Sequence, residues 1–364
     1  MGTVYSDDCL GADGLGYFYR CANQGESEKI AMTNNPVSMK LLRILVLALA
    51  MAHSCLSYAD VPASEVAPPG SVAPIQRGWH ALEFQATGVA GSVTTRIDLR
   101  KASGTDIRAM LLDEASLKSA HAAAGRVVEL DVQSRVQLLV GGGIETRERL
   151  WFNEEDGLPL QLTRIRRGNK PSSKQYRFGR DRVYRLRKKP ENETQAGQSP
   201  EHWSRSSESF YALPAGECRS VLESLQLFYL LSSPQYGISE ASQTLCVFNR
   251  KHLYQVEIRL AQPGPIDLDH VQVAAEGKAG IRETRETIHL VINSRPLEDR
   301  AAAVKPFSFL GMQGEIHVLL SDPGRVPLRI SGKVPGFGVI DLELRKLVGC
   351  ADQDCIQQSN EESS

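Results

Sequence analysis

Apolar and polar residues alternate along most of the chain between positions 79 and 344, which is the period of a β-strand with one buried face. The longest alternation covers 126–140, where Ser134 alone interrupts the apolar side. The even-numbered positions are apolar: Val128, Leu130, Val132, Val136, Leu138 and Val140. The odd-numbered positions are polar: Glu129, Asp131, Gln133, Arg135 and Gln137. We therefore expect one long strand with an apolar core side and a polar solvent side.

Shorter segments with the same period follow one another, separated by turn-forming residues, and predict a mainly β protein of antiparallel meanders. We expect a single β domain over 77–347, made of two similar halves, 77–187 and 208–347. An exposed polar loop at 188–207 joins them, and a polar tail covers 348–364. The other expected strands are 81–86, 92–99, 144–152, 159–163, 175–178, 182–187, 245–248, 254–260, 288–292, 315–320, 326–331 and 339–344.

One segment, 217–233, has the period of an amphipathic helix and is followed by Pro234. Its apolar stripe consists of Val221, Leu222, Leu225, Phe228 and Tyr229. A second segment, 106–124, has apolar residues at mixed spacing among several alanines. It predicts a helix or an irregular insertion.

Two segments 168 residues apart read alike without a gap: 152–163 and 320–331. Each is a strand end, a polar turn, an apolar residue, Pro-Leu and a second strand, with the prolines at Pro159 and Pro327. Proline is tolerated at the start of a strand, where its missing N–H is not needed. The match favours two similar halves. The alternative is two unrelated hairpins that share turn chemistry.

The segment 39–59 has the features of a bacterial secretory signal peptide. Lys40 and Arg43 precede nine uncharged residues at 44–52, and the small residues Ser57 and Ala59 mark a cleavage site. Nine residues reach only about 14 Å as a helix, which is too short to span a bilayer. We expect a periplasmic protein with a flexible linker at 60–76. The alternative is a lipoprotein anchored at Cys55, although the residues before Cys55 fit a lipobox poorly.

The 38 residues before Met39 lack apolar periodicity. They are either an unusually long polar leader or the consequence of a misassigned start. After cleavage four cysteines remain: Cys218, Cys246, Cys350 and Cys355. An even number in an oxidising compartment predicts disulfides, with three possible pairings. Pairing of neighbours in sequence, 218 with 246 and 350 with 355, is favoured over a zinc site, because no Cys-x-x-Cys spacing is present.

No local motif for catalysis, nucleotide binding or metal binding is found, so we expect no enzyme activity, no cofactor and no metal. His289 and His317 fall on polar parities and are predicted to face solvent. Asp267, Asp269 and His270 are expected on a loop or a strand edge. The formal net charge is −1, which gives no overall field for nucleic acid, and export would separate the protein from it.

Charge is concentrated in one segment, 164–189, which holds twelve basic residues and a single acid, Asp181. On adjacent antiparallel strands these residues would form a positive face or rim. We expect contact with anionic head groups of envelope molecules, where each basic residue contributes about 1 kcal/mol. The alternative is a solvated face that prevents edge pairing. The expected contact residues are Arg164, Arg166, Arg177, Arg185 and Arg187.

The span 79–347 resembles the bacterial exported family called domain of unknown function 3108. The resemblance rests on the leucine-rich segment 222–231, on Phe-Ser-Phe-Leu-Gly-Met-Gln-Gly at 307–314, and on 325–330 running into Lys-Val-Pro-Gly at 333–336. The hairpin 151–162 is similar to hairpins of periplasmic lipoprotein-carrier and envelope-stress sensor proteins. These resemblances imply one or two open half-barrels around a helix. They imply no known activity.

The leading hypothesis is non-catalytic binding of an apolar or amphiphilic, lipid-like envelope molecule in such a half-barrel, without a membrane span after cleavage. The alternatives are a module for interaction with another envelope protein and, less favoured, a hydrolase of envelope polymers. The residues expected to line the apolar site are Val128, Leu130, Val132, Leu222, Leu225, Phe228 and Tyr229.

Overall fold

The computed structural model describes residues 78–349 except 89–90, 114–116, 118, 140–141, 215–217, 219, 234–241, 275–276 and 298–303. The chain divides into the units Met1–Glu65 and Val66–Ser364, and every described residue belongs to the second. The leader, the signal segment, Cys55, the linker, Cys350 and Cys355 lie outside the described residues, so the expectations on them stay predictions.

The amino-terminal half is an antiparallel meander in which each strand pairs with the next from β1 to β8. Its strands are β1 (Trp79–Gly88), β2 (Gly91–Ser103), β3 (Arg126–Leu138), β4 (Gly143–Asn153), β5 (Pro159–Gly168), β6 (Ser172–Phe178), β7 (Arg182–Lys189) and β8 (Arg205–Ala212). Short helices interrupt the meander: α2 (Gly104–Arg108), α3 (Glu193–Ala196) and the 3₁₀ turn η1 (Pro200–His202).

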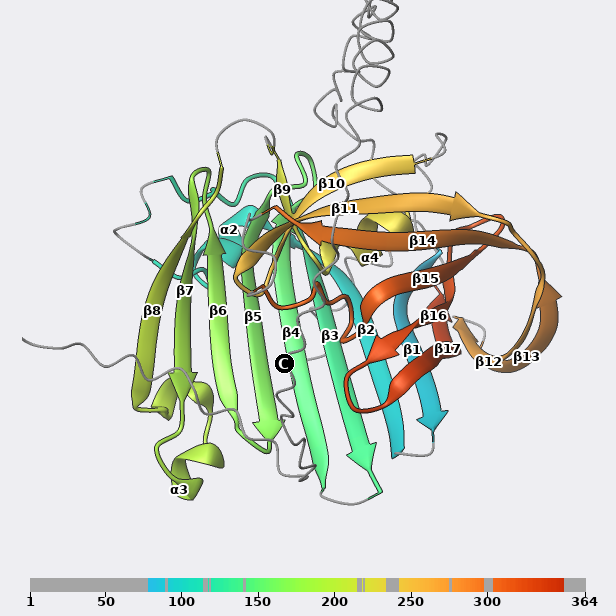
Figure 1. Ribbon diagram of the computed structural model, residues 1–364, viewed down its shortest axis with the longest axis horizontal. Helices are drawn as coiled ribbons and strands as arrows, with labels where there is room; N and C mark the ends of the chain where they lie inside the picture. Colours follow the sequence, from blue (N-terminus) through green and yellow to red (C-terminus); the bar gives the residue numbers. More distant parts are fainter. Residues whose placement is uncertain are drawn as a thin grey trace, which may run out of the picture. The chain divides into compact units, whose positions relative to one another are not determined.

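The carboxy-terminal half contains β9 (Val221–Glu223), α4 (Gln226–Leu231), β10 (Ser242–Asn249), β11 (His252–Ala261), β12 (Ile266–Ala274), β13 (Gly277–Arg285), β14 (Thr287–Pro296), β15 (Gln313–Ser321), β16 (Pro327–Val334) and β17 (Gly338–Gly349). β11 pairs with β10 and β14, and pairing continues through β15 and β16 to β17. β17 then pairs with β1, which joins the halves into one sheet (Figure 1). The sheet is mixed, because β9 runs parallel to β10, and β12 runs parallel to β17.

The prediction of a mainly β protein of antiparallel meanders is confirmed, and the sheet is open rather than closed. The predicted strand 126–140 is β3, and most other predicted strands lie within observed ones. Strands β8, β12 and β13 were not predicted, and β9 lies in the segment predicted to be helical. Among the described residues, no helix combines the length and the apolar character needed to cross a membrane.

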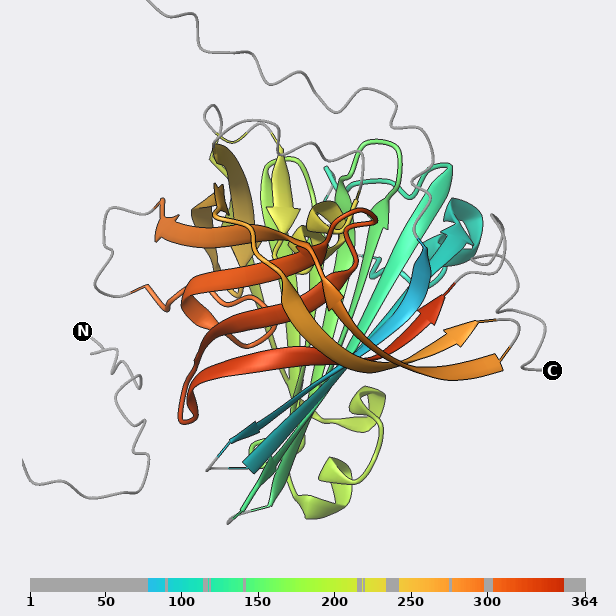
Figure 2. The ribbon, with the colours of Figure 1, turned by 90° about the vertical axis from the view of Figure 1, so that its right-hand side faces the viewer.

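A main apolar core lies between strands of the two halves, and α4 packs into it (Figures 1 and 2). Phe228 of α4 makes edge-to-face contacts with Trp79 and Phe84 of β1, while Tyr229 contacts Phe152 of β4. Residues of β11 and β14–β16, including Val256 and Ile316, complete the same cluster. The helix therefore connects the two halves through aromatic packing.

The helix predicted over 217–233 is wrong in length. Val221 and Leu222 belong to the short strand β9, and only 226–231 is helical. The Cys218–Cys246 disulfide and the parallel pairing of Val221 with Cys246 hold this segment extended beside β10. An apolar stripe at helical spacing was thus divided between a strand and a helix that share one core, an example of tertiary packing overriding periodicity.

The segment 188–207 is not simply an exposed loop. β7 extends to Lys189, β8 begins at Arg205, and α3 and η1 lie between them. The Trp203 side chain is buried, and its indole N–H donates to the Gln195 carbonyl at 2.6 Å. The segment 106–124 likewise contains little helix, since α2 ends at Arg108.

The internal match is present in three dimensions. In the β4–β5 hairpin Phe152 pairs with Pro159 after a register shift, and in the β15–β16 hairpin Leu320 pairs with Pro327 after a register shift. The shifts occur at equivalent positions, 168 residues apart. Shared turn residues alone would not require equivalent irregularities inside the strands, so the two hairpins are built alike.

Candidate functional site

The strands β5, β6 and β7 have two different faces, and cross-strand register shows which residues share each face. Leu162 pairs with Tyr176, and Tyr176 pairs with Arg185. Because Leu162 and Tyr176 belong to the main core, we call this side the core face. The opposite side, which carries Arg177 and Tyr184, is the outer face.

Along the core face the side chains change from apolar to basic. Phe178, Tyr176 and Leu162 lie at the apolar end. The same parity continues along the three strands into five basic residues, which we call the cationic strip: Arg164, Arg166, Lys174, Arg185 and Arg187. Within it Arg164 pairs with Lys174, which pairs with Arg187. All five are buried or partly buried rather than fully exposed.

The cationic strip has few partners. Arg164 forms an ion pair with Glu148 of β4. Arg185 donates to the Ser209 hydroxyl at 3.0 Å and lies 5.5 Å from the centre of the Tyr211 ring. Within the described part of the chain, the side chains of the other three members of the strip form no hydrogen bond or ion pair.

Crowding of positive charge affects Lys174 strongly. Burial and the charges of Arg164, Arg187, Arg185 and Arg250 lower the pKa of Lys174 to about 7. At neutral pH this amine is therefore neutral in a large fraction of molecules. Because the charge of Arg250 acts on Lys174, the turn between β10 and β11, in the carboxy-terminal half, lies near the strip.

A buried acid lies near Arg164 of the strip. Glu223 is 1% exposed. Its two carboxyl oxygens accept from the Ser224 hydroxyl at 2.8 Å and from the Leu225 N–H at 2.6 Å. Burial raises the pKa of Glu223 to about 7, against the opposing effect of Arg164. Because both oxygens are engaged at the start of α4, this group stabilises the local turn and is not presented to a ligand.

The predicted head-group contacts are brought together in four of five cases. Arg164, Arg166, Arg185 and Arg187 lie on the core face, whereas Arg177 points to the outer face. The Arg177 guanidinium donates to the carbonyls of Leu160 at 2.7 Å, His121 at 2.6 Å and Phe178 at 3.3 Å. It ties the segment before β3 to the sheet, and burial lowers the pKa of Arg177 to about 10.

Six of the seven residues predicted to line an apolar site are fully buried in the main core: Val128, Leu130, Val132, Leu225, Phe228 and Tyr229. Leu222 is partly buried and packs against the core from β9. Binding at these positions stays a prediction. The described residues make them a packed cluster of α4, β3 and neighbouring strands.

Sequence reasoning missed two parts of the site. Lys174 was recognised as basic but not as a central residue, although its parity with Tyr176 and Phe178 was readable. Arg250 and Glu223 carry no sequence signal, because only the packing of β9 and the β10–β11 turn brings them to the strip.

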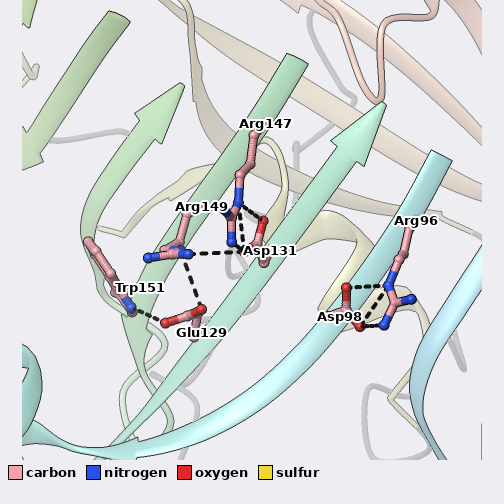
Figure 3. A network of polar contacts seen from close by, with 7 residues as sticks. All are labelled: Arg96, Asp98, Glu129, Asp131, Arg147, Arg149 and Trp151. Atoms are coloured by element: carbon pink, nitrogen blue, oxygen red, sulfur yellow. Dashed lines mark hydrogen bonds and ion pairs between the residues drawn. The ribbon is translucent and has the colours of Figure 1, made fainter. Parts of the chain in front are cut away.

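The outer face of β2–β4 carries a second charged network, which is self-compensated (Figure 3). Asp131 accepts from Arg147, with both carboxyl oxygens 3.0 Å from Nε, and from Arg149 at 3.2 Å. Glu129 accepts from the Trp151 indole at 2.8 Å. The expectation that these acids face solvent is wrong, because Asp131 is 1% and Glu129 9% exposed.

Other predicted groups have clear positions. The Cys218–Cys246 disulfide is confirmed, with a Cα–Cα distance of 5.7 Å. His289 and His317 are hydrogen-bonded to each other, with 3.0 Å between Nε2 and Nδ1. In the described ranges, no three His, Cys, Asp or Glu residues are grouped so that they could hold a metal ion.

No protein-family model matches the chain, and no curated protein matches it. A similar solved structure is the crystal structure of a β-barrel-like protein of domain of unknown function DUF1849 from Brucella abortus. The two chains are 9% identical with a TM-score of 0.40, and the match covers 75% of this chain and 98% of that chain. Membership of the 3108 family stays a prediction.

Proposed function

We propose that the protein is a non-catalytic, exported binding protein for an amphiphile with an anionic head group. The observation that carries the proposal is the change from apolar to cationic along one face of β5–β7. Leu162, Tyr176 and Phe178 lie on the same face as the cationic strip. An amphiphile presents an apolar chain beside a polar head, so such a face complements both parts.

The apolar part of the ligand would lie along side chains that border the main core. Leu222 and Tyr211 are partly buried and pack against that core from β9 and β8. Tyr211 also lies beneath the Arg185 guanidinium, at the boundary between apolar and cationic residues. The head group would contact the cationic strip, as the sequence hypothesis holds for Arg164, Arg166, Arg185 and Arg187.

Two features support export. Residues 39–59 have the organisation of a signal peptide, and Cys218 and Cys246 form a disulfide, which persists in oxidising compartments. The resemblance to the exported 3108 family agrees with the same location. In that compartment the abundant anionic amphiphiles are the phospholipids and glycolipids of the envelope.

The test is to express the full chain with its leader in a Gram-negative bacterium and purify it from the periplasm. We expect native mass spectrometry to show a bound amphiphile and amino-terminal sequencing to place the mature start near Asp60. A protein without any extractable amphiphile would contradict the binding function. An uncleaved cytosolic chain with reduced Cys218 and Cys246 would contradict export.

A matched pair of variants localises the binding. Arg166→Gln with Arg187→Gln removes two charges from the core face, and Arg167→Gln with Lys188→Gln removes two from the outer face of the same strands. We expect the first variant to lose most of the co-purified amphiphile and the second to retain it. Equal losses would contradict a head-group site on the core face.

A further inference from the structure

Three basic side chains form one row across the middle of the cationic strip. Lys174 is the direct cross-strand partner of Arg164 on β5 and of Arg187 on β7. Directly opposed residues have Cβ atoms about 4.5–5.5 Å apart, and like charges at these positions destabilise a sheet. The row is therefore expected to destabilise the folded protein when no ligand is bound.

Further groups converge on Lys174 from the elements packed around the row. Arg185 lies one row toward the apolar end, and Arg250 faces it from the β10–β11 turn. The charged groups that act on Lys174 are Arg164 on β5, Arg185 and Arg187 on β7, and Arg250. The titratable groups that act on Arg164, Tyr176 or Arg250 around them are Glu148 on β4, Tyr176 on β6, Tyr211 on β8, Glu223 on β9 and Tyr254 on β11. Positive groups outnumber the two carboxyl groups, one of which is the buried Glu223.

The Arg250 turn is itself unusual. Asn249 pairs with His252, so Arg250 and Lys251 form a two-residue hairpin turn, and Arg250 has a φ of 62°. Glycine and asparagine are favoured at such positions, because other residues are strained there. The Asn249 amide donates to the Ser224 hydroxyl at 2.7 Å and to the Ser308 carbonyl at 3.0 Å, which anchors the turn. Rule-breaking residues of this kind concentrate at functional sites.

Hydrogen-bonding capacity in the strip is also unused. The Nε atoms of Arg166, Arg185 and Arg187 are buried and have no hydrogen-bond partner, whereas Nε of Arg164 is paired with Glu148. Two other arginines with this property, Arg177 and Arg329, lie outside the strip. Three such groups on one face of three adjacent strands make a concentrated set of donors. Buried donors normally find acceptors.

We propose that the row Arg164–Lys174–Arg187, together with Arg185 and Arg250, binds a dianionic oxyanion group of the phosphoryl type. This inference rests on the proposed function and specifies the polar end of its ligand. Guanidinium groups match the geometry of phosphate oxygens, and a dianion offers enough acceptors and charge for several of them at once. A carboxylate would leave most of the row uncompensated.

Proton uptake should accompany binding. The lowered pKa of Lys174, caused by burial and the surrounding arginines, leaves it largely neutral near pH 8. A bound dianion offsets those positive charges and favours the ammonium form. Sulfate is the suitable probe, because it is dianionic and does not itself titrate in this range. Calorimetric titration in two buffers of different ionisation enthalpy then measures the protons taken up.

The binding experiment uses the mature exported protein, freed of bound amphiphile, with sulfate and pyrophosphate as free anions. Lysophosphatidic acid is the lipid probe, and lysophosphatidylcholine, whose phosphate carries a single negative charge and a neighbouring ammonium, is its control. Lys174→Met and Arg187→Gln are the test variants. Arg167→Gln, an exposed outer-face neighbour of Arg166, removes the same charge elsewhere.

We expect both free anions to bind, each test variant to bind at least tenfold more weakly, and Arg167→Gln to change affinity less than twofold. Proton uptake should disappear in Lys174→Met. Tighter binding of lysophosphatidic acid than of pyrophosphate would identify a lipid head group as the source. The reverse order would support the same dianion site with a free phosphate compound as its ligand and would remove the amphiphile from the proposed function.

Two results would overturn the inference. One is the absence of sulfate and pyrophosphate binding at millimolar concentration. The other is an equal loss of affinity in Arg167→Gln and Arg187→Gln, which would mean that only overall charge matters. If lysophosphatidylcholine bound as tightly as lysophosphatidic acid while free anions did not bind, the dianion site would be rejected and amphiphile binding would stand.

Discussion

Asp131 shows how a polar residue in an alternating strand can be buried. Arg147 and Arg149 of β4 cover its carboxylate, and Trp151 covers the neighbouring Glu129 (Figure 3). On the same side of the sheet, the segment after β2 packs a small apolar cluster against β3–β5: Ile107, Ala123, Val127, Trp151 and Leu160. The first part of β3 is therefore buried on both faces. Its acids became structural ion-pair partners rather than solvent-facing groups.

Removal of the Asp131 charge should be costly. Asp131→Asn would leave the guanidinium groups of Arg147 and Arg149 without their shared carboxylate. Because both arginines are partly exposed, we expect a loss of about 1–3 kcal/mol in the free energy of unfolding, measured by urea denaturation. Glu145→Gln is the control, since Glu145 meets Arg135 at 3.8 Å on an exposed surface and should cost less than about 0.5 kcal/mol. Equal effects would contradict this account.

The segment from Cys218 to α4 contacts strands of both halves. Its disulfide joins it to β10, and the Gln226 side chain donates to the Gly157 carbonyl of the β4–β5 turn at 2.7 Å. Glu223, Ser224 and Asn249 form hydrogen bonds beneath the same region. A strand of three residues and a helix of six have little stability of their own, so these contacts hold them in place.

Loss of the disulfide should weaken this element. The two cysteines are separated by 28 residues, and closing a loop of that length in the unfolded chain corresponds to about 3–4 kcal/mol. We expect the free energy of unfolding of the double variant Cys218→Ala, Cys246→Ala, measured by urea denaturation, to be lower by that amount. A thiol reductant should lower the free energy of unfolding of the wild type to that of the double variant. A variant as stable as the oxidised wild type would show that packing alone holds the segment.

At the scale of the whole molecule, two of the titrating groups in the described residues, Glu223 and Lys174, have opposite effects on stability. Glu223 has a folded-state pKa of about 7, above its ordinary value of 4.5, so the folded chain keeps this proton to a higher pH than the unfolded chain does. Lys174 has a folded-state pKa of about 7, below its ordinary value of 10.5, so the folded chain loses this proton at a lower pH than the unfolded chain does. By linkage, Glu223 lowers the free energy of unfolding as pH rises from about 4.5 to 7. Lys174 raises it from about 7 to 10.5.

We therefore expect a substitution of each residue to remove its own contribution to the pH dependence of the free energy of unfolding, measured by urea denaturation between pH 5 and 10. Glu223→Gln should reduce the fall in stability below pH 7 relative to the wild type. Lys174→Met should reduce the rise above pH 7 and should stabilise the protein at pH 7. Curves parallel to that of the wild type would contradict the assignment of these two groups.

Strand positions were readable from the sequence because alternation is a local property. Gly141 to Gly143 follow the β3 alternation, and the Pro159 and Pro327 hairpins were found by comparing residues within the chain. The unpredicted strands β8, β12 and β13 bury few side chains, only Leu268 and His270 of β12 among them, so no extended apolar face marked them. The apolar stripe at 221–229 predicted a longer helix than the structure has, although its apolar positions were identified correctly. Its apolar residues are all in contact with the core, but a disulfide and a parallel neighbour determined the backbone.

By itself, the sequence determined that this is a mainly β protein with a concentrated basic segment and paired cysteines, since composition, parity and spacing are properties of the chain. Tertiary structure alone decided which charges meet. Register placed Lys174 between Arg164 and Arg187, packing of the segment before β3 brought the His121 carbonyl to Arg177, and the β10–β11 turn added Arg250. Electrostatic interactions depend on distance and burial, and both are determined only when remote strands pack together.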